Sequence, residues 1–299
     1  MMFSLNPNSI RDVLKRRGSR AVRVLDLPQF TIDQFGLRAL NLTAGLLKGL
    51  TPDDLAHLRD VGDRAGCACL LLSQHEQLGA GDKDEAKRAD VVDRVRRLIR
   101  AAEILGCNSV SIRLKGQDTD EVFDRTASTL KMTLETADQA EMNLLVEPAS
   151  GLTEDPDRLT DLVKAVGGFR IGTMPDFESA AKSGDPVAYL KRLTPYASVV
   201  NASTLGFELS APAEDRGSGE TKDDKTPGGL EELAAELEGM MDAPPPEHVG
   251  FDLNKLVGAI AAVGFDGNIA LDYRGGEDGT LGVLHSKDAI EAALKAAAE

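Results

Sequence analysis

The sequence has few basic residues for its length. Its 299 residues include 34 Lys and Arg against 49 Asp and Glu, which gives a formal net charge of -15. Binding to phosphates requires Lys and Arg gathered on one face, so this balance argues against DNA or RNA as a partner. An anionic surface also disfavours anionic membranes. We therefore expect neither a nucleic-acid partner nor a membrane partner.

Long apolar runs and recognisable cysteine or nucleotide motifs are also missing. No stretch approaches the ~20 apolar residues of a membrane span, and residues 1–25 contain no signal-peptide apolar segment, so we expect a cytoplasmic protein. Cys67, Cys69 and Cys107 have no C-x-x-C spacing and lie in or beside apolar runs, which predicts reduced, buried thiols. Neither G-x-G-x-x-G after a strand nor G-x-x-x-x-G-K-[ST] occurs, which argues against a nucleotide-binding doubly wound sheet.

Apolar segments of strand length alternate with helical patterns along the chain. The helical pattern is clearest at 89–106, where Val91, Val95, Leu98, Ile99 and Ala102 form one stripe. The eight expected strands are 2–5, 37–43, 68–74, 109–114, 143–149, 169–176, 198–203 and 268–273. Most are continuously apolar, which is typical of parallel strands covered by helices. We predict a single (β/α)8 TIM-barrel domain over 1–299, with functional side chains at the carboxyl ends of its strands.

One segment interrupts this alternation. Residues 208–248, after the seventh expected strand, are rich in charge, Gly and Pro, and we expect a flexible, acidic surface insertion there. Within it, Leu230, Leu233, Ala234, Leu237 and Met241 share one helical face. A short helix in this segment would fold over the barrel mouth or against a partner chain.

Three of the expected strands stop at a carboxylate. The strands end at Glu147, Asp176 and Asp272, and the seventh strand contributes Asn201. Carboxyl ends of parallel strands meet at one rim, and carboxylates that converge on a rigid rim hold a divalent cation or transfer a proton. The alternative is that these acids cap strand ends or pair with Arg113, Arg170 or Arg274.

Several of these segments resemble the xylose isomerase-like sugar phosphate isomerase/epimerase family. The similarity is carried by ADVVDRVRRLIRAAEILGCNSVSIR, LLVEPASGLTEDPDRLTDLVKAV and IGTMPDF, and by FDLNKLVGAIAAVGFDGNIALDYRGG for the last helix and strand. It covers nearly all of the chain except the insertion at 208–248. The resemblance implies a TIM barrel with a carbohydrate substrate and one divalent ion, Mn or Mg, bound by Glu, Asp, His and Glu.

Carried over to this chain, the resemblance assigns metal-ligand positions to Glu147, Asp176, Asn201 and Asp272. Asn201 stands where the family usually has His, and Asp272 where Glu is usual. An amide oxygen suits Mg or Mn better than zinc, and the shorter Asp272 side chain retracts its carboxylate by ~1 Å. Pro148 follows Glu147 where the family commonly continues with Asn-His.

The resemblance also implies a reaction, proton transfer at the carbon next to a ketose carbonyl. Glu147 would act as the base and Asp272 as its partner, with metal assistance. A second hypothesis is a catalytically degenerate barrel that serves as a sugar-binding or interaction protein. An endonuclease would need more His ligands and a basic groove, and Schiff-base chemistry would need a Lys on an inner strand position, which the expected strands lack.

Three further residues are candidates for substrate binding. His75 ends the third expected strand, Ser203 stands where the family often has Lys, and Arg274 begins a turn suited to a phosphate group. We expect the other histidines, at 57, 248 and 285, to be surface residues. A homo-oligomer is a possible assembly.

Overall fold

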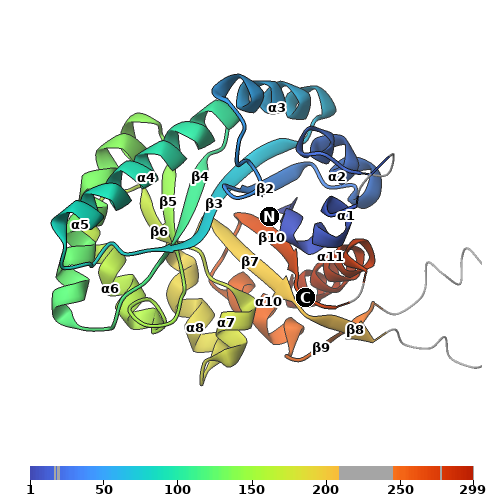
Figure 1. The fold of residues 1–299 in the computed structure, drawn as a ribbon. Helices are drawn as coiled ribbons and strands as arrows, with labels where there is room; N and C mark the ends of the chain where they lie inside the picture. Colours follow the sequence, from blue (N-terminus) through green and yellow to red (C-terminus); the bar gives the residue numbers. More distant parts are fainter. Residues whose placement is uncertain (17, 19–20, 209–244, 277, 299) are drawn as a thin grey trace, which may run out of the picture.

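The eight expected strands form one parallel sheet that curls into a barrel (Figure 1). In this computed structural model, residues 1–16, 18, 21–208, 245–276 and 278–298 are described. The strand order is β6-β5-β4-β3-β2-β1-β10-β7, and isolated parallel bridges join Thr173 to Ala197 and Asp176 to Asn201, between β6 and the β7 side of the sheet. The strands are β1 Met2–Leu5, β2 Ala39–Thr43, β3 Ala68–Leu78, β4 Ser109–Leu114, β5 Asn143–Glu147, β6 Ile171–Thr173, β7 Val199–Thr204 and β10 Asn268–Tyr273. The predicted (β/α)8 fold is confirmed.

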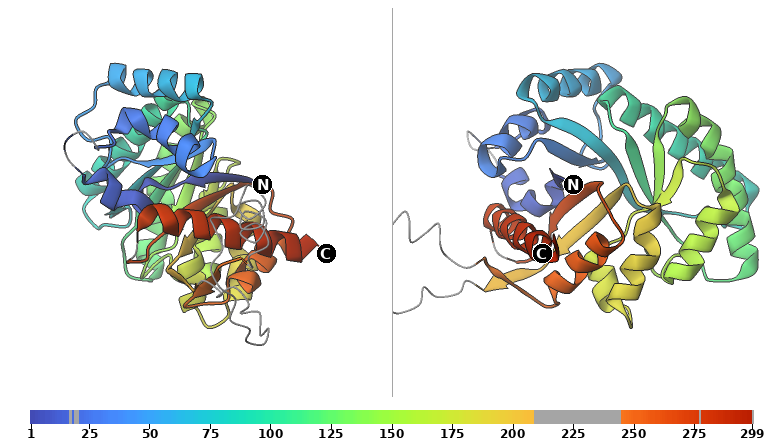
Figure 2. Two further views of the ribbon diagram at one scale, coloured as in Figure 1. Left: turned by 90° about the vertical axis from the view of Figure 1, so that its right-hand side faces the viewer. Right: turned by 180° about the vertical axis from the view of Figure 1, so that it is seen from behind.

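Helices cover the outside of this barrel (Figure 2). They are α1 Arg11–Leu14, α2 Leu27–Phe35, α3 Pro52–Ala65, α4 Glu85–Leu105, α5 Asp120–Gln139, α6 Pro156–Val166, α7 Phe177–Lys182, α8 Pro186–Leu193, α10 Leu253–Ala262 and α11 Gly279–Ala298. The predicted apolar stripe of α4 is buried, whereas the short α7 was not expected from the sequence. None of the helices in the described part of the chain is long and apolar enough to cross a membrane.

Local sequence signals explain where these helices begin and end. The Asp155 side chain accepts a hydrogen bond from the Arg158 amide and caps the start of α6, where Pro156 follows as the first helical residue. Gly106 ends α4 with a φ of 78°, a conformation that residues with a Cβ rarely adopt. The Asp155 cap thus fixes the loop between β5 and α6 at the carboxyl end of the strands, and Gly106 fixes the turn from α4 into β4.

A two-stranded hairpin borders the predicted insertion. Strands β8 (Gly206–Glu208) and β9 (Glu247–Val249) pair antiparallel, and residues 209–244, including the helix expected within the insertion, lie outside the described residues. The surface assignment of His248 was wrong. Its Nε2 accepts a hydrogen bond from the Leu205 amide at 3.0 Å, its ring packs on Phe207 and Phe251, and burial lowers its pKa.

The other histidines and the cysteines differ in their exposure to solvent. His57 is exposed as expected, whereas His285 is half-buried with its ring 5.7 Å from that of Phe207. Cys67, Cys69 and Cys107 are free and buried, which confirms the prediction. Burial raises the pKa of Cys67 to about 12, so this thiol stays protonated at neutral pH.

Barrel closure depends on a glycine in β6. A Cβ added to Gly172 would lie 2.3 Å from the Tyr196 carbonyl oxygen, which is backbone and cannot rotate away. We expect Gly172→Ala to lower the free energy of unfolding by about 2 kcal/mol or more, measured by urea denaturation. Gly258→Ala is the matched control, because Gly258 lies in α10 with open space around it and alanine should stabilise that helix by about 0.5–1 kcal/mol. Equal effects of the two substitutions would contradict the prediction.

Candidate functional site

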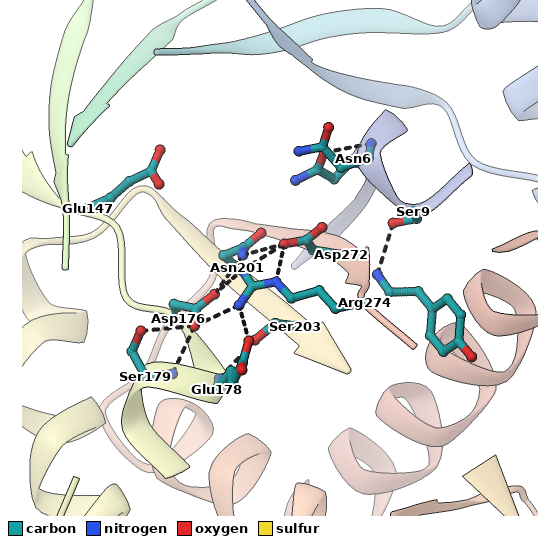
Figure 3. Close-up of polar contacts among 12 residues, drawn as sticks. Asn6, Ser9, Glu147, Asp176, Glu178, Ser179, Asn201, Ser203, Asp272 and Arg274 are labelled. Carbon is teal, nitrogen blue, oxygen red and sulfur yellow. Dashed lines mark hydrogen bonds and ion pairs between the residues drawn. The ribbon is translucent and has the colours of Figure 1, made fainter. Parts of the chain in front are cut away.

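The predicted rim residues lie at the carboxyl end of the barrel and are buried. Glu147, Asp176, Asn201 and Asp272 are 5–7% exposed. Figure 3 shows that they form two groups: Asn201 contacts both Asp176 and Asp272, whereas Glu147 lies apart. The structure therefore brings together three of the four residues predicted as metal ligands.

The guanidinium of Arg274 lies at the centre of the first group (Figure 3). Its Nη2 donates to Asp176 Oδ2 at 2.6 Å and its Nε to Asp272 Oδ2 at 2.9 Å. Its Nη1 donates to Glu178 Oε2 at 2.5 Å and lies 3.3 Å from Asp176 Oδ1. We call Asp176, Glu178, Asn201, Asp272 and Arg274 the arginine cluster.

The local backbone explains how these side chains converge. Asp176 is the N-cap of α7, where its Oδ1 accepts hydrogen bonds from the Ser179 amide at 2.8 Å and the Ser179 hydroxyl at 3.1 Å. Arg274 follows Asp272 by two residues, and its amide donates to the Thr204 carbonyl, which continues the ladder between β10 and β7. In an extended chain, residues two apart face the same side, so Arg274 points to the same side as Asp272.

Asn201 turns its donor group, not its oxygen, toward the carboxylates. Its Nδ2 donates to Asp176 Oδ2 at 2.7 Å and to Asp272 Oδ2 at 2.9 Å. The opposite amide orientation would place Oδ1 against two carboxylate oxygens, which repel it. Oδ1 of Asn201 is buried and has no hydrogen-bond partner among the described residues.

The charges of the cluster stabilise one another. Burial raises the pKa of Asp176, but the charge of Arg274 and hydrogen bonds from Asn201, Arg274 and the Ser179 amide outweigh burial, so this pKa is below its ordinary value. Burial lowers the pKa of Arg274, but the charges of Asp176 and Asp272 raise it above its usual range. The Asp176 carboxylate is therefore ionised and the guanidinium charged at neutral pH.

Glu147 has its own partners on neighbouring strands. Its Oε1 accepts a hydrogen bond from the Ser111 hydroxyl at 2.6 Å, and its Oε2 accepts one from Arg113 Nε at 2.7 Å. The Ser111 hydroxyl also lies 2.8 Å from that of Ser73. Pairing of rim acids with Arg113 and Arg274 was the alternative expected from the sequence, and the structure contains both pairs.

The remaining predicted residues differ in their exposure. His75 is exposed, with Nδ1 3.4 Å from Asn8 Nδ2, whereas Ser203 is fully buried and accepts a hydrogen bond from the Glu178 amide at 2.8 Å. Their roles in substrate binding stay predictions, as does that of Arg274. Sequence reasoning missed Ser111 and Glu178. The spacing of Ser111 and Arg113, two apart on one strand, would have placed both on the side that faces Glu147.

A cavity of about 320 Å³ lies beside both groups. Its lining includes Ala149, which follows Glu147 by two residues, and Ser179, which binds Asp176. Further lining residues are Ser150, Glu154, Lys182 and Ser183. Hydroxyl, carboxylate and ammonium groups thus border a space at the carboxyl end of the barrel.

Fold and site together define a (β/α)8 barrel with a buried acidic rim at its carboxyl end. The model of the xylose isomerase-like TIM barrel family matches residues 32–298. The chain belongs to this family.

Solved structures with low sequence identity share the fold. An L-ribulose 3-epimerase is 14% identical with a TM-score of 0.73, over 100% of this chain and 96% of that chain. The IolI protein with a bound zinc atom is 12% identical with a TM-score of 0.68, over 99% of both chains. The probable 3-DHS dehydratase AsbF from Bacillus anthracis is 14% identical with a TM-score of 0.64, over 96% of this chain and 98% of that chain. No curated protein matches the chain.

The residues in place do not fit the divalent ion that the family implies. Within the described ranges, no group of three or more His, Cys, Asp or Glu is arranged to hold a metal ion. Asp176 and Asp272 each share an oxygen with a guanidinium and with the Asn201 amide. Both of these groups are hydrogen-bond donors, and a donor cannot ligate a cation.

Proposed function

We propose that the protein binds a small carbohydrate at the carboxyl end of the barrel, in the cavity beside the rim. The cavity itself carries this proposal. Its volume of about 320 Å³ is at the lower end of ordinary ligand pockets, which suits a monosaccharide. Ser150, Glu154, Ser179 and Ser183 offer donors and acceptors for hydroxyl groups, and Lys182 would add a positive charge for a phosphorylated sugar.

The family relationship supports a carbohydrate over other small molecules. Two similar structures are D-psicose 3-epimerases, one with D-tagatose and one in the presence of D-fructose. We therefore expect ketoses, or the corresponding sugar phosphates, to be the first ligands worth testing. This proposal prefers the sugar-binding form of the second hypothesis from the sequence, a catalytically degenerate barrel that serves as a sugar-binding or interaction protein.

Calorimetric titration with D-tagatose, D-fructose and fructose 6-phosphate tests this proposal. Binding of one of them should weaken at least tenfold in Ala149→Trp, whose indole would fill the cavity. Ala86→Trp is the matched control, because Ala86 is exposed on α4 and does not line the cavity. Failure of all three sugars to bind, or equal affinity in the two tryptophan variants, would refute the proposal.

A second candidate is the sugar isomerase or epimerase that the sequence favoured. Glu147 on β5 and Asp272 on β10 are both buried at the same end of the barrel, where one would act as base and the other as acid. Deuterium incorporation next to the carbonyl of D-tagatose, followed by NMR in D2O, tests this candidate. Exchange that is lost in Glu147→Gln would support it, and dependence of that exchange on added Mn²⁺ would support metal assistance. Absence of exchange alongside measurable binding would leave carbohydrate binding as the function.

A further inference from the structure

In the arginine cluster, carboxylates surround a positive charge as they would surround a bound cation. Here the positive charge belongs to an arginine side chain. Arg274 donates through all three of its guanidinium nitrogens, and its partners are the carboxylates of Asp176, Glu178 and Asp272. These charge-assisted bonds are 2.5–2.9 Å long, and Nη2 also lies 2.8 Å from Asp272 Oδ2. The guanidinium thus neutralises the same two aspartates that the sequence predicted as metal ligands.

We propose that Arg274 replaces a divalent ion at this rim, so that the protein holds Asp176 and Asp272 in place without metal. Conversely, removal of the guanidinium exposes an oxygen site that binds a divalent ion. The inference concerns the same rim as the proposed function but does not depend on the identity of the sugar.

Two features of the cluster exclude a metal ion while Arg274 is in place. A divalent ion needs oxygen ligands at about 2.0–2.6 Å, but Asp176 Oδ2 and Asp272 Oδ2 are both occupied by guanidinium and amide hydrogens. An incoming ion would also be repelled by the positive charge of Arg274. A metal would therefore have to displace the guanidinium and reverse the Asn201 amide at once.

The position of Arg274 on the chain makes this replacement permanent. Arg274 directly follows Tyr273, the last residue of β10, its amide continues the ladder to Thr204, and its side chain is only 25% exposed. Lys182, paired with the other Glu178 oxygen at 2.5 Å, adds a second positive charge at the edge of the cluster. The carboxylates are thus paired with positively charged side chains of the protein.

Electron paramagnetic resonance of Mn²⁺, recorded without any sugar, tests the inference. The wild-type protein should leave Mn²⁺ free at concentrations that saturate Arg274→Ala, a gain in affinity of at least tenfold for the variant. Arg113→Ala is the matched control, because it also removes an arginine paired with a rim carboxylate, Glu147, but lies outside the cluster. The double variant with Asp176→Asn and Arg274→Ala should lose this gain in Mn²⁺ affinity.

The result can contradict the inference in two ways. Mn²⁺ binding by the wild type as tight as by Arg274→Ala would show that the guanidinium does not occupy the place of the ion. No gain of binding in a folded Arg274→Ala, or an equal gain in Arg113→Ala, would show that the cluster contains no latent metal site. If circular dichroism shows that Arg274→Ala does not fold, Arg274→Gln carries the same measurement with less loss of volume. Because no sugar is present, failure here is distinct from failure of the proposed function.

Discussion

Arg274→Ala should lower the free energy of unfolding by about 3–5 kcal/mol at neutral pH, the cost of breaking a buried ion pair by removing one partner. The substitution leaves Asp176 and Asp272, which are 6% and 5% exposed, without their compensating charge. Urea denaturation followed by circular dichroism measures this loss.

Two further variants test whether the loss of stability comes from unpaired charge or from lost packing. Asp176→Asn combined with Arg274→Ala should cost less than the sum of the two single substitutions, because each single change leaves an unpaired charge. Arg113→Ala should cost clearly less than Arg274→Ala, since the Arg113 side chain is 34% exposed and pairs with one carboxylate. A loss for Arg274→Ala no larger than that for Arg113→Ala would contradict the argument.

Asp176→Ala is expected to have an effect of similar size, about 3–5 kcal/mol. It removes the main partner of Arg274 and also the cap of α7, which alone contributes about 1 kcal/mol. Asp176→Asn keeps an oxygen that can accept from the Ser179 amide, so it should cost less than Asp176→Ala. Urea denaturation of the three proteins checks the order, and equal losses in both variants would show that the charge, not the cap, accounts for the whole effect.

The same carboxylate should make the protein sensitive to acid. The pKa of Asp176 is lower in the folded protein than the ordinary value of about 3.9. Its contribution to stability is therefore complete above about pH 3.9 and is lost as the pH falls through the lower, folded value. The unfolding midpoint should fall less steeply below about pH 4 in Asp176→Asn than in the wild type. Parallel pH profiles would argue against this role of Asp176.

The barrel could be predicted because its signals are local. Apolar runs and capped helical patterns repeat along the chain, so six of the eight strand ends fell within two residues of the observed positions without any knowledge of contacts. One exception is β3, which continues four residues past its expected end to Leu78. The other is β6, which is only Ile171–Thr173, because the chain leaves the sheet after Thr173 to form the cap of α7 at Asp176. The rim acids followed from the same reasoning, since parallel strands bring their carboxyl ends together.

The interaction partners of the rim side chains could not be predicted from the sequence in the same way. Arg274 was predicted as a candidate for binding a phosphate and, in the alternative, as a partner of the rim acids. In the structure its side chain pairs with the two aspartates, which offer a buried pair of negative charges. Whether Asn201 offers its oxygen or its amide hydrogens depends on neighbours that are distant in sequence. The local signal was the spacing of Asp272, on β10, and Arg274, the residue after its end; this spacing of two fixes a direction but not a partner.

The β8–β9 hairpin has a consequence for how this protein can evolve. Because Glu208 pairs with Glu247, the ends of β8 and β9 that border the intervening segment lie one strand spacing apart, about 4.8 Å. The entropic cost of closing a loop grows only slowly with its length, so residues can be gained or lost there with little effect on the barrel. Differences in length between related chains should therefore accumulate between β8 and β9, with little effect on the geometry of the rim.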